Sequence, residues 1–205
     1  QVTVIGVDEA TYATVSDFGE FLQHPRNRQQ LDFQLKDGGY DTIDHQATDP
    51  AKLLPRIQMA SSGWKHRREQ ASFAPVVSVP DGALRGNPFI TPSNPGATSG
   101  DEAGGQKQGA NFDPAKEQHT GAVLGIGLCA YRTLDGGDGF LAVPGDDVEI
   151  SYPTASRPPK VLTSKFTIVD FYESKMSEYD SSFVFVPIRK LQEIRGMFDP
   201  STHVY

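Results

Sequence analysis

The sequence predicts an α+β fold of two small mixed α/β lobes, the smaller of them rich in β-strands. Three runs are typical of strands, because apolar and polar side chains alternate in the first and β-branched and aromatic residues dominate the other two. These runs are 148–152, 165–172 and 182–188. Only short, turn-rich segments connect them, which favours antiparallel pairing because parallel strands need longer crossovers. Helical spacing of apolar residues near both ends of the chain supplies the α component.

The positions of these patterns divide the chain. Its 205 residues can bury one sizeable core, or two small cores that share an interface. We assign the β-rich lobe to 120–186, and the second lobe to 1–90 together with 187–205. The segment 91–118 contains five Gly and three Pro and only one large apolar residue. We therefore predict a mobile insertion on the surface there.

The N-terminal elements are read from spacing and capping. Residues 2–7 form an apolar run that predicts a strand, and Asp8 is a suitable N-cap for a helix after it. The apolar residues of that helix recur every three or four positions and are Tyr12, Val15, Phe18 and Leu22. A second helix is expected to start at Asp49-Pro50 and to contain Leu53, Leu54 and Ile57, although Pro55 disturbs its first turns.

The last predicted element is a helix. Pro187 suits its first turn, and Gly196 can close it. Its apolar face consists of Ile188, Leu191 and Ile194. The chain therefore ends, as it begins, with a strand and a helix in close succession.

Composition excludes some partners. The chain has 19 Lys and Arg against 26 Asp and Glu, a formal charge of −7, whereas binding a nucleic-acid backbone needs clustered cations. The one basic cluster is Lys65-His66-Arg67-Arg68, which we interpret as an exposed turn of solvated charge. No window approaches the roughly 20 apolar residues that cross a bilayer. Any membrane segments are expected outside 1–205, which has the character of one domain excised from a longer protein.

A glycine pattern raises one enzymatic alternative. In "GAVLGIGLCAYR", Gly125, Gly127 and Ala130 can be read as G-x-G-x-x-A after an apolar run, the fingerprint of a dinucleotide-binding turn. That fingerprint acts inside a parallel sheet, however, whereas antiparallel strands are predicted to follow here. A domain or enzyme that binds a small molecule or nucleotide through this turn is therefore the alternative function.

Other signs of catalysis are missing from the sequence. It has no G-x-S-x-G, P-loop, H-E-x-x-H or C-x-x-C motif, and its five histidines have no ligand-like spacing. Cys129 lies in an apolar run and is interpreted as a small buried hydrophobe. We expect no catalytic residues, no cofactor and no metal.

Four stretches resemble the extracytoplasmic domain of MacB/FtsX-like permeases, above all the lipoprotein-releasing branch. They are "VIGVDEATYATVSDFGEFL", "GAVLGIGLCAYR", "VPGDDVEISYP" and "KFTIVDFYESKMSEYDSSFVFVPIRKLQEI", in the family's order and over about half of the chain. Two positions depart from the family pattern. Asp170 stands where the family usually has Gly, and Lys175 stands where Gly usually precedes Met176.

The resemblance implies that this domain catalyses no reaction and acts mechanically. Such domains contain two mixed lobes, the β-rich one as an insertion, and stand on membrane helices at the periplasmic face of the bacterial cytoplasmic membrane. A separate ATPase subunit or domain hydrolyses ATP in the cytoplasm. The domain then transmits the motion to a lipoprotein, a periplasmic carrier or another envelope protein, and the permease is expected to be dimeric.

The resemblance also implies candidate partner-binding residues. In the lipoprotein-releasing branch, the segment that matches "PTASRPPK" forms a projecting hook that engages the soluble carrier. The candidates here are Arg157, Pro158, Pro159 and Lys160. Met176 and Tyr179, expected at a hairpin tip, form a second candidate surface. An ordinary connection between two strands is the structural alternative for the first segment.

Overall fold

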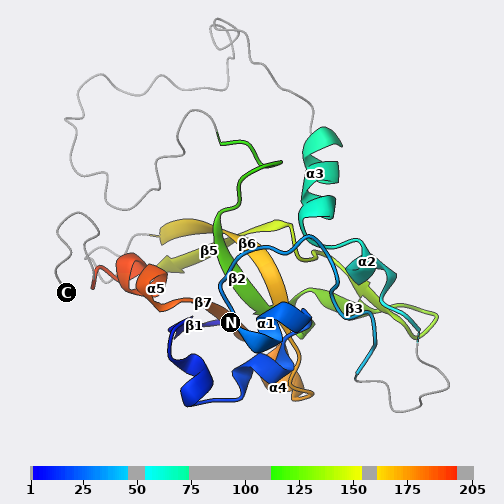
Figure 1. Ribbon diagram of the computed structural model, residues 1–205, viewed down its shortest axis with the longest axis horizontal. Helices are drawn as coiled ribbons and strands as arrows, with labels where there is room; N and C mark the ends of the chain where they lie inside the picture. The colour runs from blue at the N-terminus through cyan, green and yellow to red at the C-terminus, as the bar shows by residue number, and fades with distance from the viewer. Residues whose placement is uncertain (1, 46–53, 74–111, 154–160, 198–205) are drawn as a thin grey trace, which may run out of the picture.

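The computed structural model describes residues 2–45, 54–73, 112–153 and 161–197 (Figure 1). They form a mixed α+β fold with a five-stranded half-barrel sheet, a small two-stranded sheet and few helices. The strands are β1 (Thr3–Val7), β2 (Thr120–Gly125), β3 (Ala130–Arg132), β4 (Asp138–Phe140), β5 (Asp147–Pro153), β6 (Val161–Tyr172) and β7 (Phe183–Pro187). The α-helices are α1 (Pro25–Gln29), α2 (Ile57–Ala60), α3 (Trp64–Phe73), α4 (Ser177–Asp180) and α5 (Ile188–Ile194). The predicted α+β class is confirmed.

The large sheet has the strand order β1-β7-β2-β6-β5. β5 and β6 pair antiparallel as predicted, but β6 and β7 do not pair, because β2 lies between them and is parallel to β6. β1 pairs parallel to β7. One sheet therefore takes strands from both of the ranges assigned to separate lobes, 1–90 and 120–186.

Apolar side chains cover both faces of this sheet. On one face, residues of β2, β6 and β7 pack with Tyr40, Met59 and Phe140 and with the turn after β2. On the other face, Val123, Val169 and Phe185 pack against the segment that follows β1. Alternation along each strand sends neighbouring residues to opposite cores. Burial on both faces explains why β2 and β7 are almost wholly apolar.

The predicted helix after β1 is wrong. Two short 3-10 turns stand in its place, Tyr12–Thr14 and Phe18–Phe21. The Asp8 carboxylate accepts a hydrogen bond from the Thr11 hydroxyl at 2.7 Å, and the Ser16 hydroxyl accepts one from the backbone N–H of Phe18 at 3.1 Å. Such side-chain bonds compete with the helical backbone pattern and favour turns.

The C-terminal helix is confirmed as α5. Pro187 is its N-cap, one position earlier than expected. Gly196 has φ +67°, a conformation that favours glycine. Its N–H donates to the Glu193 carbonyl, and the N–H of Met197 donates to the Gln192 carbonyl. This pair of bonds is the Schellman motif that ends helices.

The middle of the chain contains two helices where one was predicted. The expected start at 49–53 lies outside the described residues, and α2 begins two positions after Pro55. Of the predicted insertion, 91–111 lies outside the described residues, whereas the Gln118 side chain accepts from the Leu35 N–H at 2.7 Å and donates to the Phe33 carbonyl at 3.0 Å. Across the part of the chain described here, no helix has the length and apolar character needed to span a bilayer.

Candidate functional site

β5 and β6 extend beyond the rest of the sheet as a two-stranded arm. β2 pairs with β6 only from Phe166 onward, whereas β5 pairs with β6 back to Val161. Among the described strands, 161–165 therefore has one neighbour instead of two, and every second residue of it is exposed. We call 149–153 together with 161–165 the β5–β6 arm.

Polar side chains join the two strands of the β5–β6 arm. The hydroxyls of Ser151 and Thr163 lie 3.1 Å apart, and the Lys165 ammonium lies 3.5 Å from the Glu149 carboxylate. Such exposed cross-strand pairs contribute little energy each, so the backbone ladder holds the arm together. The connecting segment 154–160, with the candidates Arg157, Pro158, Pro159 and Lys160, lies outside the described residues.

Met176 and Tyr179 lie at the opposite end of β6 from the β5–β6 arm (Figure 1). They belong to α4 and its N-cap, and the predicted hairpin tip is wrong because β6 and β7 are not neighbours. The Met176 side chain is 54% exposed. The Tyr179 ring stacks on Phe183 with a centroid distance of 5.0 Å. The second candidate surface therefore lies at the other end of β6 from the β5–β6 arm, whereas the first lies outside the described residues.

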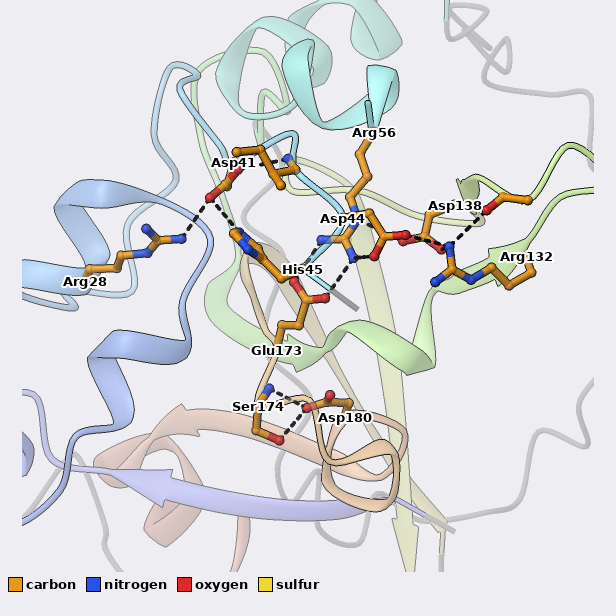
Figure 2. Close-up of polar contacts among 12 residues, drawn as sticks. Arg28, Asp41, Asp44, His45, Arg56, Arg132, Asp138, Glu173, Ser174 and Asp180 are labelled. Carbon is orange, nitrogen blue, oxygen red and sulfur yellow. Dashed lines mark hydrogen bonds and ion pairs between the residues drawn. The ribbon is translucent and has the colours of Figure 1, made fainter. Parts of the chain in front are cut away.

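The turn into α4 is tightly held. Lys175 has φ +65°, a left-handed conformation that is rare for residues other than glycine. The Asp180 carboxylate accepts hydrogen bonds from the backbone N–H and the hydroxyl of Ser174, both at 2.8 Å (Figure 2). This Asp180 is 1% exposed, so α4 is tied to the end of β6 by a buried acid.

The Gly125-x-Gly127 stretch is a packing feature. β2 ends at Gly125 and leads into a 3-10 turn, Ile126–Leu128. A Cβ added at Gly125 would lie 2.3 Å from the Asp180 carbonyl oxygen, and one at Gly127 would lie 3.1 Å from it. The backbone of α4 thus occupies the space beside these glycines. The turn offers no open cradle for a pyrophosphate, and no long helix follows it as the fingerprint requires.

A buried ion cluster joins the two sheets (Figure 2). At its centre, the Arg56 guanidinium binds Glu173 at the end of β6 at 2.8 Å and Asp138 of β4 at 2.9 Å. Asp44 lies 3.3 Å from Arg56 and 2.6 Å from Arg132. Two guanidinium groups therefore face three carboxylates between the small sheet and β6.

The cluster is closed to solvent at its centre. Arg56 is 1% exposed and Glu173 is 5% exposed. Burial lowers the pKa of Arg56, but hydrogen bonds and charge from Glu173 and Asp138 outweigh it and raise the pKa above its ordinary value. The Arg56 guanidinium donates its hydrogen bonds to carboxylates of the protein, so we interpret the cluster as a structural contact and not as a ligand site.

A cleft of about 480 Å³ lies between α3 and the segment after β4. His66 and Asp146 line it, with their Nε2 and Oδ1 atoms 2.7 Å apart. Gln58, Ser61 and Gln70 add polar atoms, and the Gln58 side chain also accepts the N–H of Phe140 at 2.7 Å. The His66–Asp146 contact therefore links α3 to the segment after β4 within the cleft.

The basic cluster at 65–68 is not the exposed turn that the sequence predicted. It is part of α3, and Arg67 is 4% exposed. Its guanidinium donates to the Asp147 carboxylate at 2.7 Å and to the Gly145 carbonyl at 2.9 Å. Arg68, by contrast, has a side chain that is 57% exposed. Only part of the cluster is solvated, because the helix turns Arg67 toward the sheet.

Asp170 is a further buried acid, and the sequence predicted no structural role for it. Its carboxylate accepts the backbone N–H groups of Gln23 and His24, both at 3.1 Å, and the Asn27 side-chain amide at 2.8 Å. Burial raises the pKa of Asp170 to about 6, although these donors act in the opposite direction. The residue anchors the start of α1 to the sheet.

The predicted role of Cys129 is confirmed. Its side chain is buried in the core next to the turn after β2. Burial raises the pKa of its thiol to about 11, so the reactive thiolate is scarce at neutral pH. Within the described ranges, His, Cys, Asp and Glu side chains form no group of three or more that could hold a metal ion.

Comparison with family models, with curated proteins and with solved structures finds no match to this chain. The residues that sequence reasoning missed are the buried charges Arg56, Arg67, Glu173 and Asp170. Their partners are distant in sequence, by 117 positions for Arg56 and Glu173. One signal was present, because Asp170 interrupts an apolar stretch of the sequence. A carboxylate buried there needs hydrogen-bond donors or an opposite charge beside it.

Proposed function

We propose that this chain is the extracytoplasmic domain of a MacB/FtsX-like ABC transporter permease. In this proposal a separate ATPase hydrolyses ATP in the cytoplasm, and membrane helices outside 1–205 carry the motion to the domain. The domain transmits it to a lipoprotein, a periplasmic carrier or another envelope protein. It is no enzyme and takes no cofactor or nucleic acid. The permease is dimeric, and the domain lies at the periplasmic face of the cytoplasmic membrane.

The observation that carries this proposal is the β5–β6 arm. The resembled branch has a partner-binding projection between the strands that correspond to β5 and β6. Here these two strands run past the rest of the sheet, and 161–165 pairs with β5 alone among the described strands. The arm therefore holds Pro153 and Val161, which flank the segment 154–160 in the sequence, beyond the rest of the sheet. Arg157 and Lys160 belong to that segment by sequence.

The turn into α4 supports the same proposal. The family usually has Gly immediately before the Met that corresponds to Met176, and Lys175 stands there in this chain. Lys175 has φ +65°, a conformation in which glycine is favoured. The backbone at this position therefore has the conformation that glycine favours, although the residue in this chain is lysine.

The ends of the described chain also fit a domain carried on membrane helices. β1 and β7 are neighbouring parallel strands, and α5 packs against β1. A Cβ at Gly6 would lie 3.0 Å from a methyl group of Leu191. The first and last described elements are thus in contact, as suits a domain inserted between two segments of a longer chain. The finer division into two lobes, with 120–186 inserted, stays part of this proposal.

The proposal is tested first on the flanking coding sequence. We expect one membrane helix encoded before Gln1 and three after Tyr205, and co-purification of an ATPase with the full-length protein. A flanking sequence without membrane helices overturns the proposal. If, in addition, nucleotides or dinucleotides raise the melting temperature of the 205-residue chain, the small-molecule alternative replaces it.

The partner site has its own test in the full-length permease. The variant Arg157→Glu/Lys160→Glu is expected to lose cargo release while the protein stays folded in the membrane. The matched control is Lys65→Glu/Arg68→Glu, which makes the same charge change at exposed positions of α3. Cargo release and ATPase activity are measured together for all three proteins. If the arm variant retains both at wild-type levels, 154–160 is an ordinary connection.

A further inference from the structure

Within the described residues, no strand pairs with the outer edge of β1. Among the described strands β1 pairs only with β7. The N–H of Thr3 donates to the Ser182 carbonyl at 2.7 Å, so Thr3 faces β7. Because successive residues of a strand direct their backbone groups to opposite sides, Val4 and Gly6 face outward. Among the described residues, β1 has no strand neighbour on that side, and no backbone hydrogen bond from outside the sheet reaches Val4 or Gly6.

In the part of the chain that the structure describes, this edge lacks the usual features that prevent strand addition. β1 reads TVIGV, without charge or proline, and it has a regular register with β7. The opposite edge of the sheet, β5, has Asp147 and Glu149 and ends at Pro153. Charges and prolines of this kind protect an edge, whereas an apolar edge with open groups is a template for another strand.

We propose that β1 pairs antiparallel with β1 of a second copy of this chain, which makes one continuous sheet across a two-fold axis at Ile5. In this register Val4 of each copy lies opposite Gly6 of the other. In such a hydrogen-bonded antiparallel pair, each of the two facing residues donates its N–H to the carbonyl of the other. The outward N–H and C=O groups of Val4 and Gly6 are then hydrogen-bonded in both copies. This self-complementarity argues for a second copy over an unrelated peptide.

The side chains on both faces suit this pairing. Ile5 packs with the core on the face opposite α5, and the axis places it directly across from Ile5 of the second copy, an apolar cross-strand pair. On the other face, α5 contacts both β1 and β7. The two α5 helices are therefore separated by about two strand spacings, roughly 10 Å, which is the packing distance of two helices.

Sedimentation velocity of the 205-residue chain tests the pairing over about a hundredfold range of concentration. We expect the mass to double as concentration rises. Added salt should favour the dimer, because each copy has a formal charge of −7. Hydrogen exchange at the backbone N–H groups of Val4 and Gly6 should slow as the dimer forms, while exchange along β5 stays unchanged.

A matched pair of variants isolates the backbone contact. Val4→Pro removes the outward N–H but leaves the bonds to β7, whereas Val4→Ala trims the side chain and keeps that N–H. We expect Val4→Pro to weaken dimerisation about tenfold or more and Val4→Ala to retain it. Urea unfolding at low concentration verifies that both variants fold.

Three results overturn the inference. The chain stays monomeric over the whole range, or the dimer survives Val4→Pro at wild-type affinity, or the slowed exchange lies outside β1. Protection of Val4 and Gly6 by another protein, in a chain that never self-associates, also rejects the second copy as the occupant. None of these results bears on the transport function proposed above, which is tested in the full-length permease.

Discussion

The guanidinium of Arg56 donates to both carboxylate oxygens of Glu173, with both N–O distances 2.8 Å and both side chains 1% exposed. This bidentate pair joins the N-terminus of α2 to the end of β6 (Figure 2). Bidentate geometry is the strongest form of an ion pair in proteins, and burial makes its loss costly. The contact between the small sheet and the large one therefore depends on charge as well as on apolar packing.

The first prediction concerns this pair. Arg56→Met removes the cation that binds Glu173, which is buried, while Asp44 and Asp138 keep their ion pairs with Arg132, so we expect a loss of about 3–5 kcal/mol in the free energy of unfolding. Urea unfolding at neutral pH measures it. The control is Lys165→Met, which breaks an exposed pair with Glu149 and should cost at most about 1 kcal/mol. Equal costs for the two variants contradict a structural role for the cluster.

The second prediction concerns pH and Asp170. Its folded pKa of about 6 lies above the ordinary value of 3.8, so the folded state favours the protonated acid. The associated stability is fully present below pH 4 and is lost as pH rises through about 6. Complete titration of such a shift corresponds to about 3 kcal/mol. The wild type should therefore lose stability relative to Asp170→Asn as pH rises from about 4 to about 7.

Urea unfolding of both proteins at several pH values measures this difference. The comparison with Asp170→Asn separates Asp170 from the other acids, which titrate in both proteins. Asp135→Asn, at an exposed position, should leave the pH dependence of the wild type unchanged. A constant difference between wild type and Asp170→Asn across this range contradicts the raised pKa.

The third prediction concerns the glycine turn. A Cβ at Gly125 would lie 2.3 Å from the Asp180 carbonyl oxygen, a backbone atom that cannot move without shifting α4. We expect Gly125→Ala to destabilise the fold by about 1–3 kcal/mol or more. At Gly127 the distance is 3.1 Å, so Gly127→Ala should cost clearly less. Thermal unfolding ranks the two, and the reverse order refutes the packing role.

The fourth prediction concerns Lys175. Its left-handed conformation costs a residue with a Cβ roughly 1 kcal/mol relative to glycine. Lys175→Gly should therefore raise stability or leave it unchanged, despite the greater flexibility of the unfolded chain. Glu178→Gly, at an exposed position in α4, should instead lower it by about 1 kcal/mol. If both variants lose the same stability, the turn is not strained at Lys175.

Local patterns in the sequence were sufficient for several elements. Alternation of apolar and polar residues identifies β5, because a strand sends successive side chains to opposite faces wherever it pairs. Runs rich in apolar, β-branched and aromatic residues identify β1, β6 and β7. Pro187 and Gly196 delimit α5, because their allowed φ values act within a few residues. Alternation does not specify strand neighbours, however, and the predicted pairing of β6 with β7 fails because β2 enters between them.

The sequence by itself determined the α+β class, the main strands, the last helix and the buried state of Cys129. All of these depend on short-range preferences and on hydrophobicity, which each residue has wherever it stands. Only the tertiary structure decided the strand order, the β5–β6 arm and the roles of the buried charges. Arg67 and Arg68 are adjacent in sequence and identical in chemistry, yet one is 4% exposed and the other has a side chain that is 57% exposed. What separates them is the position of Asp147, 80 residues away, because a buried charge is stable only where the fold places an opposite charge beside it.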